Sequence, residues 1–239
     1  MKHHKKVILI TGAGKRLGRY LAEGLSEKYN IAIHYHRSKK EAMSLATHLN
    51  FCRKESTHIF QANMMSVRDI ENMVKKIVRH FGRVDILINN ASIFKTTPFG
   101  TISEEDWDQH MDTNLKGPFF CTQAVANWML HQTEDKKHFK IINIADSGGP
   151  KTRAHYLPYW VSKSGLMAMT ETLAKIFSPG IQVNTIAPGP ILFSEDAEKL
   201  KQQLPIHPSE ILKTVHYLLN TSAVTGNTLI IDQGRRYSI

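Results

Sequence analysis

Cysteine is scarce in this chain, and its scarcity excludes two classes of protein. The 239 residues include only Cys52 and Cys121, too few for a disulfide framework and wrongly spaced for a zinc finger. The 13 histidines do not compensate, because no cysteine or carboxylate completes a ligand set beside His34 and His36, which would share one strand face. We therefore predict surface histidines, no metal site, and packing cysteines in a reducing compartment.

Long hydrophobic runs are also missing. No stretch approaches the roughly 20 apolar residues that cross a bilayer. The apolar run VILI (7–10) near the N-terminus is too short for the core of a signal peptide. The sequence thus predicts a cytoplasmic protein without a membrane partner.

Acidic residues are fewer than basic ones, 21 against 31, which favours anionic partners. The dense basic clusters are KHHKK (2–6) and HRSKK (36–40), and the other basic residues are spread along the chain. Spread charge favours small anions over a nucleic acid, which calls for a concentrated basic surface. We predict no nucleic-acid partner.

What the sequence does contain is a regular alternation of short β-branched runs and longer amphipathic segments. Apolar residues recur three and four apart in the helical stretches, as Ile70, Met73, Val74 and Ile77 illustrate. This alternation predicts α/β architecture, with seven parallel strands in one doubly wound sheet and helices on both faces. No linker interrupts it, so a single domain over residues 1–239 is expected. Strands are predicted at 7–11, 31–35, 58–62, 84–90, 140–145, 181–187 and 228–232, and helices near 16–28, 39–50, 66–81, 103–131, 156–177 and 208–220.

A glycine-rich turn, TGAGKRLG (11–18), joins the first strand to the first helix. Gly12, Gly14 and Gly18 permit a tight bend and let backbone N–H groups approach a pyrophosphate at the helix N-terminus. The turn lies in a βαβ unit, the context that such a fingerprint requires. Glycines needed only for the shape of the turn are the alternative.

The second strand ends in HYHRSKK, without the acid that usually holds the ribose 2′-hydroxyl of NAD near this point. Arg37 and Ser38 offer a guanidinium and a hydroxyl, which suit a 2′-phosphate, and His36 would add positive field. NADPH is therefore predicted over NADH. A solvated basic turn is the alternative.

Two later strand ends complete the predicted cofactor crevice. Asn63 and Met64 follow the third strand, where the Asn63 amide oxygen would accept from the adenine amino group. NNAS (89–92) follows the fourth strand, and its small residues and amides would let the cofactor ribose pack closely.

Together these features resemble the short-chain dehydrogenase/reductase family. The motifs TGxxxxxG, NNA, the asparagine of MDTN, Tyr-x-x-x-Lys and a PG after the sixth strand occur in the family order from Val7 to about Gly234. The resemblance implies a Rossmann fold and NAD(P)-dependent hydride transfer. The predicted cofactor-binding residues are Gly12, Gly14, Arg16, Leu17, Gly18, His36, Arg37, Ser38, Asn63, Met64, Asn90, Ala91, Ser92, Tyr159, Lys163, Pro188 and Gly189.

Two departures narrow the resemblance. Arg16 replaces a usual glycine of the turn, and Asp146 replaces the usual serine 13 residues before Tyr159. With HYHRS and NNASIF, they resemble pteridine reductases and the related bacterial dihydrofolate and dihydromonapterin reductases. In that subfamily the arginine matching Arg16 reaches cofactor phosphate and ligand, the serine matching Ser92 contacts cofactor and pterin, and the aromatic matching Phe94 stacks on the pterin.

Plainer readings of these residues stay open. Arg16 can be an exposed residue at the start of a helix, and Phe94 a core phenylalanine. Trp160, beside the tyrosine, is expected to pack the helix.

Tyr159 and Lys163 are four residues apart, which places them on one helix face. Tyr159 can donate the proton that accompanies hydride transfer, although a free phenol has a pKa of ~10. The charge of Lys163 would lower that pKa, and its ammonium can also bond the nicotinamide ribose. Asn114 resembles the family's asparagine that holds a water on a proton path to this lysine.

A carboxylate at Asp146 suits one substrate class better than another. It would repel the alkoxide that develops on a ketone, whereas the nitrogen of a ring C=N gains a proton. We expect Asp146 to deliver that proton with Tyr159, directly or through water. The alternative is that Ser147 acts instead, in a register slipped by one residue.

The sequence therefore predicts an NADPH-dependent reductase of a dihydropterin or dihydrofolate, as a homotetramer like its relatives. The predicted catalytic residues are Asp146, Tyr159, Lys163 and Asn114, and the predicted substrate-binding residues are Arg16, Ser92, Phe94, Asp146 and Tyr159. A carbonyl reductase, acting on a ketoacyl, quinone or sugar ketone, is one alternative, and an idle NADP-binding or basic scaffold protein is another.

Two further segments are expected near the substrate. Residues 188–208 would form a loop or short helix over the crevice, with Leu192 and Phe193 lining it. By resemblance, Arg235 or Arg236 would approach a partner subunit's site.

Overall fold

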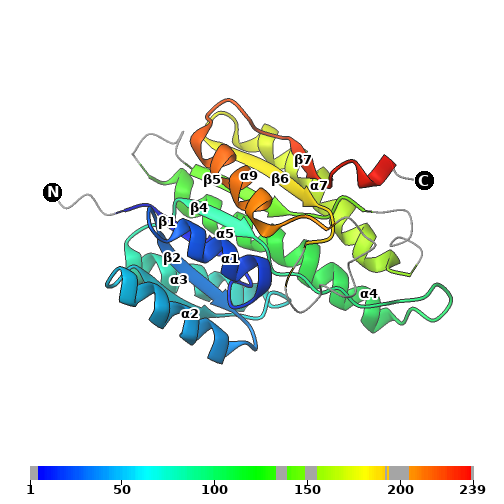
Figure 1. Cartoon of the computed structure of the whole chain (residues 1–239), viewed down its shortest axis with the longest axis horizontal. Helices are drawn as coiled ribbons and strands as arrows, with labels where there is room; N and C mark the ends of the chain where they lie inside the picture. Colours follow the sequence, from blue (N-terminus) through cyan, green and yellow to red (C-terminus); the bar gives the residue numbers. More distant parts are fainter. Residues whose placement is uncertain (1–4, 133–138, 149–154, 192, 194–204, 238–239) are drawn as a thin grey trace.

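One sheet of seven parallel strands forms the centre of the molecule (Figure 1). The computed structural model describes residues 5–132, 139–148, 155–191, 193 and 205–237. The strands follow the order β3-β2-β1-β4-β5-β6-β7, so the direction of winding reverses between β1 and β4, where a ligand crevice is expected at the carboxyl ends. They are β1 (Val7–Ile10), β2 (Asn30–Tyr35), β3 (Thr57–Gln61), β4 (Ile86–Asn89), β5 (Phe139–Ile144), β6 (Ile181–Pro188) and β7 (Thr228–Ile231).

Helices cover both faces of the sheet and bury two separate cores (Figure 1). Successive strand residues point to opposite faces, so Val7 and Leu9 enter one core while Ile8 and Ile10 enter the other. The predicted single-domain Rossmann fold is confirmed. One face carries α3 (Val67–Phe81), α5 (Gly117–Leu130) and α7 (Leu157–Phe177), and the other carries α1 (Arg16–Leu25), α2 (Lys39–Cys52) and α9 (Pro208–Asn220).

The helix predicted over 103–131 is the main departure from expectation. It is divided into α4 (Glu104–Met111), a π-helical turn η1 (Asp112–Lys116) and α5. Pro118 lies in the first turn of α5 and has no backbone N–H to continue a regular α-helical ladder. The π-helical turn contains Asn114, a predicted catalytic residue, and such turns are frequent at functional sites.

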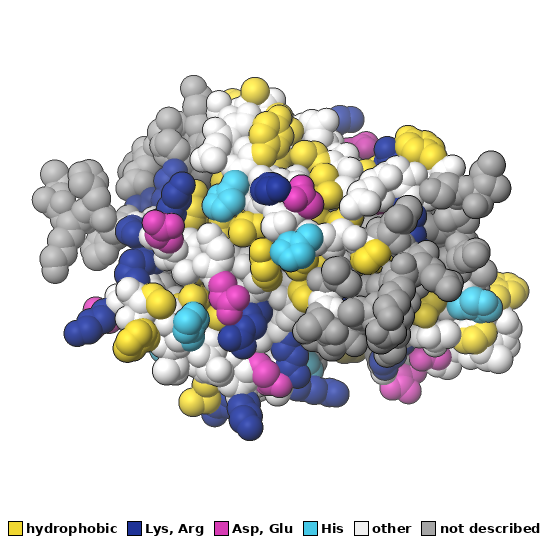
Figure 2. All heavy atoms as spheres, in the orientation of Figure 1, with side chains coloured by type: hydrophobic (Ala, Val, Ile, Leu, Met, Phe, Trp, Pro, Cys, Tyr) yellow, Lys and Arg dark blue, Asp and Glu magenta, His cyan; other side chains and the backbone are white. Residues whose placement is uncertain are grey.

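Basic and acidic side chains are interleaved on the surface. On the face shown in Figure 2, Lys and Arg side chains gather over the region of α1 and α2, with Asp and Glu among them. Two of the pairs are Lys15–Glu41 at 2.6 Å and Lys213–Glu210 at 2.7 Å. Among the described helices, none is long and apolar enough to cross a bilayer.

Candidate active site

Asp146, Tyr159 and Lys163 come together beyond the carboxyl end of β5. The Tyr159 hydroxyl donates a 2.8 Å hydrogen bond to Asp146 Oδ2, and the Gly148 N–H donates one of 2.9 Å to Oδ1. Lys163 Nζ donates to the Ile144 carbonyl at 2.8 Å and lies 5.7 Å from the centroid of the Tyr159 ring. Both carboxylate oxygens are therefore held, one of them by the phenol predicted to carry the proton.

Burial governs the pKa values of these three groups. It raises the pKa of Asp146, against the opposing effects of the hydrogen bonds from Gly148 and Tyr159 and then of the charges of Lys163 and Arg235. Burial, then the charge of Asp146 and its hydrogen bond, raise the pKa of Tyr159 well above 10. Burial also lowers the pKa of Lys163 to about 8. The sequence-based expectation of a lowered Tyr159 pKa is thus wrong here, because burial and a carboxylate outweigh a more distant ammonium.

Asp146, and not its neighbour Ser147, faces the tyrosine. The Ser147 N–H donates to the Pro188 carbonyl in β6 at 2.9 Å, which fixes the backbone of this segment against the sheet. The slipped register in which Ser147 would take the catalytic position is therefore not the arrangement observed. Asp146 therefore stands within hydrogen-bonding distance of the phenol, and the site carries an acid beside its predicted proton donor.

Asn114 is fully buried and ties the loop after β4 to α7. Its Oδ1 accepts from the Ile93 N–H at 2.8 Å and from the Ser92 hydroxyl at 3.1 Å. Its Nδ2 donates to the Ile93 carbonyl at 3.0 Å and to Ser162 Oγ at 3.2 Å. Two of these bonds hold the Ile93 backbone, and one holds the hydroxyl of Ser92, a predicted cofactor and substrate contact. The water that Asn114 is expected to hold stays a prediction.

Phe94 is a surface residue, with 53% of its area exposed, so the core alternative is wrong. Its ring stacks on Tyr156 at 4.3 Å and 7°, and it meets Tyr159 edge-on at 4.7 Å and 71°. Tyr156 was not predicted. An aromatic three residues before Tyr159 was its only sequence signal, and its partner lies far away in the chain.

Trp160 does more than pack its own helix. It is 7% exposed and covers Gly148, whose φ is +60°. A Cβ at Gly148 would lie 1.7 Å from Cη2 of Trp160. The indole ring therefore packs directly against Gly148, whose N–H donates to Asp146.

The glycine turn and the end of β2 form a cradle that fits a dinucleotide. A Cβ at Gly18 would lie 2.4 Å from the Gly12 carbonyl oxygen, and one at Gly14 would lie 3.0 Å from Ser38 Oγ. The Ser38 hydroxyl does not cap α2, which begins beside it, and Arg37 is exposed. The predicted 2′-phosphate contacts are therefore brought next to the predicted pyrophosphate turn. His36 is exposed beside them, and Leu17 is buried under the turn.

His34 corrects the prediction of surface histidines, because it is 1% exposed. The Gly12 N–H donates to its Nδ1 at 2.9 Å, and its Nε2 lies 3.0 Å from the Ala62 carbonyl oxygen. Burial lowers the pKa of His34 to about 4. His34 is thus a neutral, buried residue directly behind the glycine turn of the predicted cofactor site.

The residues that follow β4 are hydrogen-bonded to the residues that follow β1. The N–H groups of Asn90 and Ala91 both donate to Thr11 Oγ1, at 2.9 Å and 3.0 Å. Asn90 Nδ2 donates to the carbonyls of Thr11 at 2.8 Å and Gly12 at 3.3 Å. Asn90 and Ala91 therefore shape the crevice.

At the predicted adenine end of the cofactor site, Asn63 makes hydrogen bonds within the protein. Asn63 Oδ1 accepts from the Met65 N–H at 3.1 Å, and the Asn63 N–H bonds Asp69 Oδ2 at 3.2 Å. Met64 is buried. The predicted adenine contact of Asn63 stays a prediction, because its oxygen already has a partner.

Pro188, Gly189 and Arg16 are the remaining predicted site residues that the structure describes. The Gly189 N–H, next to Pro188, donates to the Ile231 carbonyl at 2.8 Å. Arg16 is exposed at the start of α1, with φ +49°, and its guanidinium carbon lies 4.7 Å from the Phe193 ring centroid. Leu192 and residues 194–204 lie outside the described residues.

The charge of Arg235 makes a small contribution at its own chain's Asp146, where it opposes the rise in pKa that burial causes. The expected approach of Arg235 or Arg236 to a partner subunit stays a prediction.

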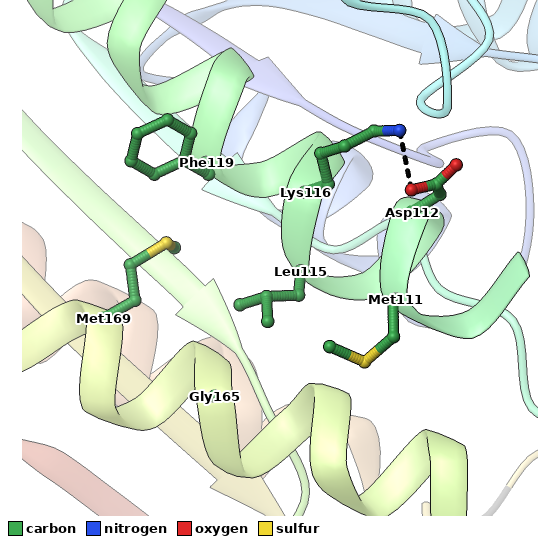
Figure 3. Close-up of a pocket in the computed structure, with 7 residues that line it drawn as sticks. All are labelled: Met111, Asp112, Leu115, Lys116, Phe119, Gly165 and Met169. Carbon is green, nitrogen blue, oxygen red and sulfur yellow. Dashed lines mark ion pairs between the residues drawn. The ribbon is translucent and has the colours of Figure 1, made fainter. Parts of the chain in front are cut away.

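A second hollow, with a volume of about 520 Å³, contains none of the predicted site residues. In Figure 3, Met111, Leu115 and Met169 point into the space between η1 and α7, and Lys116 pairs with Asp112 at 2.6 Å. The lining residues are Met111, Asp112, Leu115, Lys116, Phe119, Gly165 and Met169.

Comparison with known proteins decides the family. A model of the short chain dehydrogenases matches residues 6–204. This chain belongs to the short-chain dehydrogenase family. It is 34% identical to a 3-oxoacyl-acyl-carrier-protein reductase FabG of Staphylococcus epidermidis, over 96% of this chain and 98% of that protein. Identity to a FabG of Staphylococcus aureus is 33%, over 96% and 97%, and to a 3-oxoacyl-acyl-carrier-protein reductase of Synechocystis it is 31%, over 96% of each.

The family prediction is therefore confirmed, together with an oxidoreductase activity of this family. These relatives are named as 3-oxoacyl-acyl-carrier-protein reductases and not as pteridine reductases. The predicted subfamily is thus not supported by these relatives, whose names fit the carbonyl alternative better than pterin reduction.

Proposed function

We propose that this short-chain dehydrogenase is an NADPH-dependent reductase that converts a dihydropterin or dihydrofolate to its tetrahydro form by hydride transfer to a ring C=N. The observation that carries the proposal is the 2.8 Å hydrogen bond between the Tyr159 hydroxyl and Asp146 Oδ2. A carboxyl group at this point opposes a developing alkoxide but favours a ring nitrogen that becomes protonated.

The residues of the crevice suit each part of the cofactor. Arg37 and Ser38 would hold the 2′-phosphate, the glycine turn the pyrophosphate, and Lys163 the ribose beside the nicotinamide. When bound, the nicotinamide supplies the hydride.

Asp146 and Tyr159 would supply the proton that the ring nitrogen gains during the reduction. The raised pKa of Tyr159 keeps its hydroxyl protonated, and the raised pKa of Asp146 lets the carboxyl retain a proton at higher pH than an exposed aspartate. The pair therefore presents a proton to the ring nitrogen from a buried, preorganised hydrogen bond. General acids of this kind contribute typically ~10²–10⁴-fold to rate.

Phe94 supports a flat substrate. Its exposed ring stands edge-on to Tyr159 at 4.7 Å, so it offers an aromatic surface beside the proton donor. A stacked aromatic contact contributes about 0.5–1.5 kcal/mol beyond buried area. With Ser92 held by Asn114 and Arg16 at the start of α1, this wall would bind the bicyclic ring.

A 3-oxoacyl reductase is the second candidate, because the relatives carry that name along nearly the whole chain. In this reading Tyr159 would protonate a carbonyl oxygen, and Asp146 would hinder the reaction unless it is protonated. The two candidates therefore make opposite predictions for the removal of the carboxylate.

Steady-state NADPH oxidation distinguishes them. The purified chain would be assayed with dihydrobiopterin, dihydromonapterin and dihydrofolate, and with an acetoacetyl thioester and a quinone. We expect the dihydropterins to be reduced faster than the carbonyl compounds. Asp146→Ser should lower dihydropterin turnover ~10²-fold and raise thioester turnover. Faster reduction of the thioester by the unaltered chain would establish the second candidate, and no turnover of any compound would support an idle NADP-binding protein.

We also propose that the chain is one domain over residues 1–239 that assembles as a homotetramer in the cytoplasm, as its resemblance implies. Light scattering on the purified protein would measure the assembly, and a monomeric mass would contradict it.

A further inference from the structure

One buried side chain joins three strand ends at the predicted cofactor crevice. His34, on β2, accepts the Gly12 N–H at Nδ1 (2.9 Å), and its Nε2 lies 3.0 Å from the Ala62 carbonyl oxygen. A carbonyl can only accept, so Nε2 carries the ring proton and Nδ1 is the acceptor. The partners thus define one tautomer of a neutral ring, in contact with the residues that follow β1 and β3.

The backbone of the same residue takes the next amide. The Ala13 N–H donates to the His34 carbonyl at 3.0 Å. On its other side, the Gly12 carbonyl accepts from Asn90 Nδ2 at 3.3 Å, and Gly12 itself has φ +65°. The amides of Gly12 and Ala13 therefore both donate to His34, and Gly12 is held at its N–H and at its carbonyl.

We propose that His34 is a positioning residue of the cofactor site, which fixes Gly12 and Ala13 so that the amides after them face the pyrophosphate. The inference rests on the proposed use of NADPH. Lys15 precedes α1 without a side-chain cap, and uncapped amides of a first helical turn can bind an anion. Ala62 immediately precedes Asn63, so the same ring also connects the pyrophosphate turn to the predicted adenine end.

A purely space-filling role for His34 makes a different prediction, and matched variants separate the two. His34→Leu fills a similar volume but leaves the Gly12 N–H and the Ala62 carbonyl without partners. His34→Asn places a side-chain oxygen near the position of Nδ1, so it can accept from Gly12 while it loses the bond to Ala62. A positioning role therefore predicts rescue by asparagine, whereas a packing role predicts that the bulkier, apolar leucine is tolerated better.

The test combines cofactor binding with amide exchange in the cofactor-free protein. NADPH dissociation constants would be measured by fluorescence titration, and hydrogen exchange at Gly12 by NMR. For His34→Leu we expect affinity for NADPH to fall about tenfold, the range for a buried donor left unpaired, and Gly12 exchange to accelerate by a similar factor. His34→Asn should stay within about threefold of the unaltered chain in both, because it keeps a buried acceptor for the Gly12 N–H.

Equal NADPH affinity and equal Gly12 exchange in the unaltered chain and His34→Leu would overturn the inference. So would a larger loss in His34→Asn than in His34→Leu. If His34→Leu does not fold, His34→Gln takes its place, because its longer amide reaches Ala62 and leaves Gly12 without an acceptor. Failure of the unaltered chain to bind NADPH would refute the proposed cofactor instead, and Gly12 exchange would still decide whether His34 fixes the turn.

Discussion

A single carboxylate separates the two candidate chemistries at the scale of the residue. Asp146 is held by one N–H and one phenol, at 2.9 Å and 2.8 Å. Burial makes its ionised form less favourable, which raises its pKa. This environment is unfavourable for a carboxylate that only stabilises a positive charge on the substrate. It is favourable for a carboxyl group that must first hold a proton and then donate it.

The pH dependence of the reaction follows from that direction. If a protonated Asp146 is needed, dihydropterin reduction is fast below its raised pKa and declines as the pH passes upward through it. Asp146→Asn removes this titration, so the decline should disappear while the rate itself falls. Profiles of kcat against pH for both proteins measure this. An identical decline in the asparagine variant would assign the titration to another group.

Gly148 offers a second test at a single position. Alanine there would combine φ +60° with a Cβ 1.7 Å from Trp160, so the turn that holds Asp146 must move. We expect Gly148→Ala to lower kcat by more than about tenfold, since misplacement of a catalytic group by even ~1 Å is costly. Gly82→Ala is the matched control, because Gly82 has φ +77° but no neighbouring atom within 4 Å of the new Cβ.

The control variant should lose only about 1–2 kcal/mol of stability through its left-handed backbone, with kcat unchanged. Equal kcat in both variants would show that the Gly148 turn does not position the acid. Thermal unfolding of each protein would confirm that it is folded at the assay temperature.

At the scale of the element, a local cap fixes where α4 begins. Ser103 Oγ accepts from the Asp106 N–H at 3.1 Å, and the Asp106 carboxylate reaches back to the Ser103 N–H at 3.2 Å, so α4 begins with a complete capping box. Ser103→Ala should therefore lower the free energy of unfolding by about 1 kcal/mol. NADPH affinity should not change, and denaturant titration with and without NADPH measures both. A change in affinity would mean that α4 contributes to the cofactor site.

The elements were predictable where local pattern determines them. All seven strands and most helices follow from β-branched runs and apolar periodicity, because a buried parallel sheet demands both. The division of 103–131 was not visible, since apolar residues continue through it and a π-helical turn changes the ladder by one residue only. Element types were thus determined by sequence, while this interruption depends on how α4, α5 and α7 pack together.

The site residues, too, were predictable where local sequence pattern determines them and not where packing between distant segments does. The four-residue spacing of Tyr159 and Lys163, and Asp146 ahead of them, identified groups that the fold does bring together. The direction of the Tyr159 pKa was missed because burial cannot be read from spacing. His34 and Tyr156 were missed because their partners come from other strands and loops, far away in the sequence.

The whole molecule should show the effect of His34 in its stability. Its pKa is about 4 in the folded chain and about 6.5 when unfolded. The unfolded state therefore binds the extra proton first, so stability is fully present above pH ~6.5 and is lost as the pH falls toward ~4. Between these two pKa values, the contribution of His34 to the free energy of unfolding changes by up to about 1.4 kcal/mol per pH unit. The charge on His36 adds slightly to the effect.

Urea unfolding between pH 7 and pH ~5 measures this loss. His34→Asn should have a shallower dependence than the unaltered chain, since its side chain does not titrate. Parallel curves for the two proteins would mean that other groups dominate acid instability.

The pairing of Phe94 with Tyr156 sets a limit on what can occupy the mouth of the site. Two rings 4.3 Å apart and nearly parallel leave no gap for a third between them. A flat substrate must therefore bind on the face of Phe94 that is turned away from Tyr156. Binding there does not require the two rings to separate. A ring bound there would lie on one face of a two-ring stack, and Tyr156 would support Phe94 from behind without contacting the bound ring.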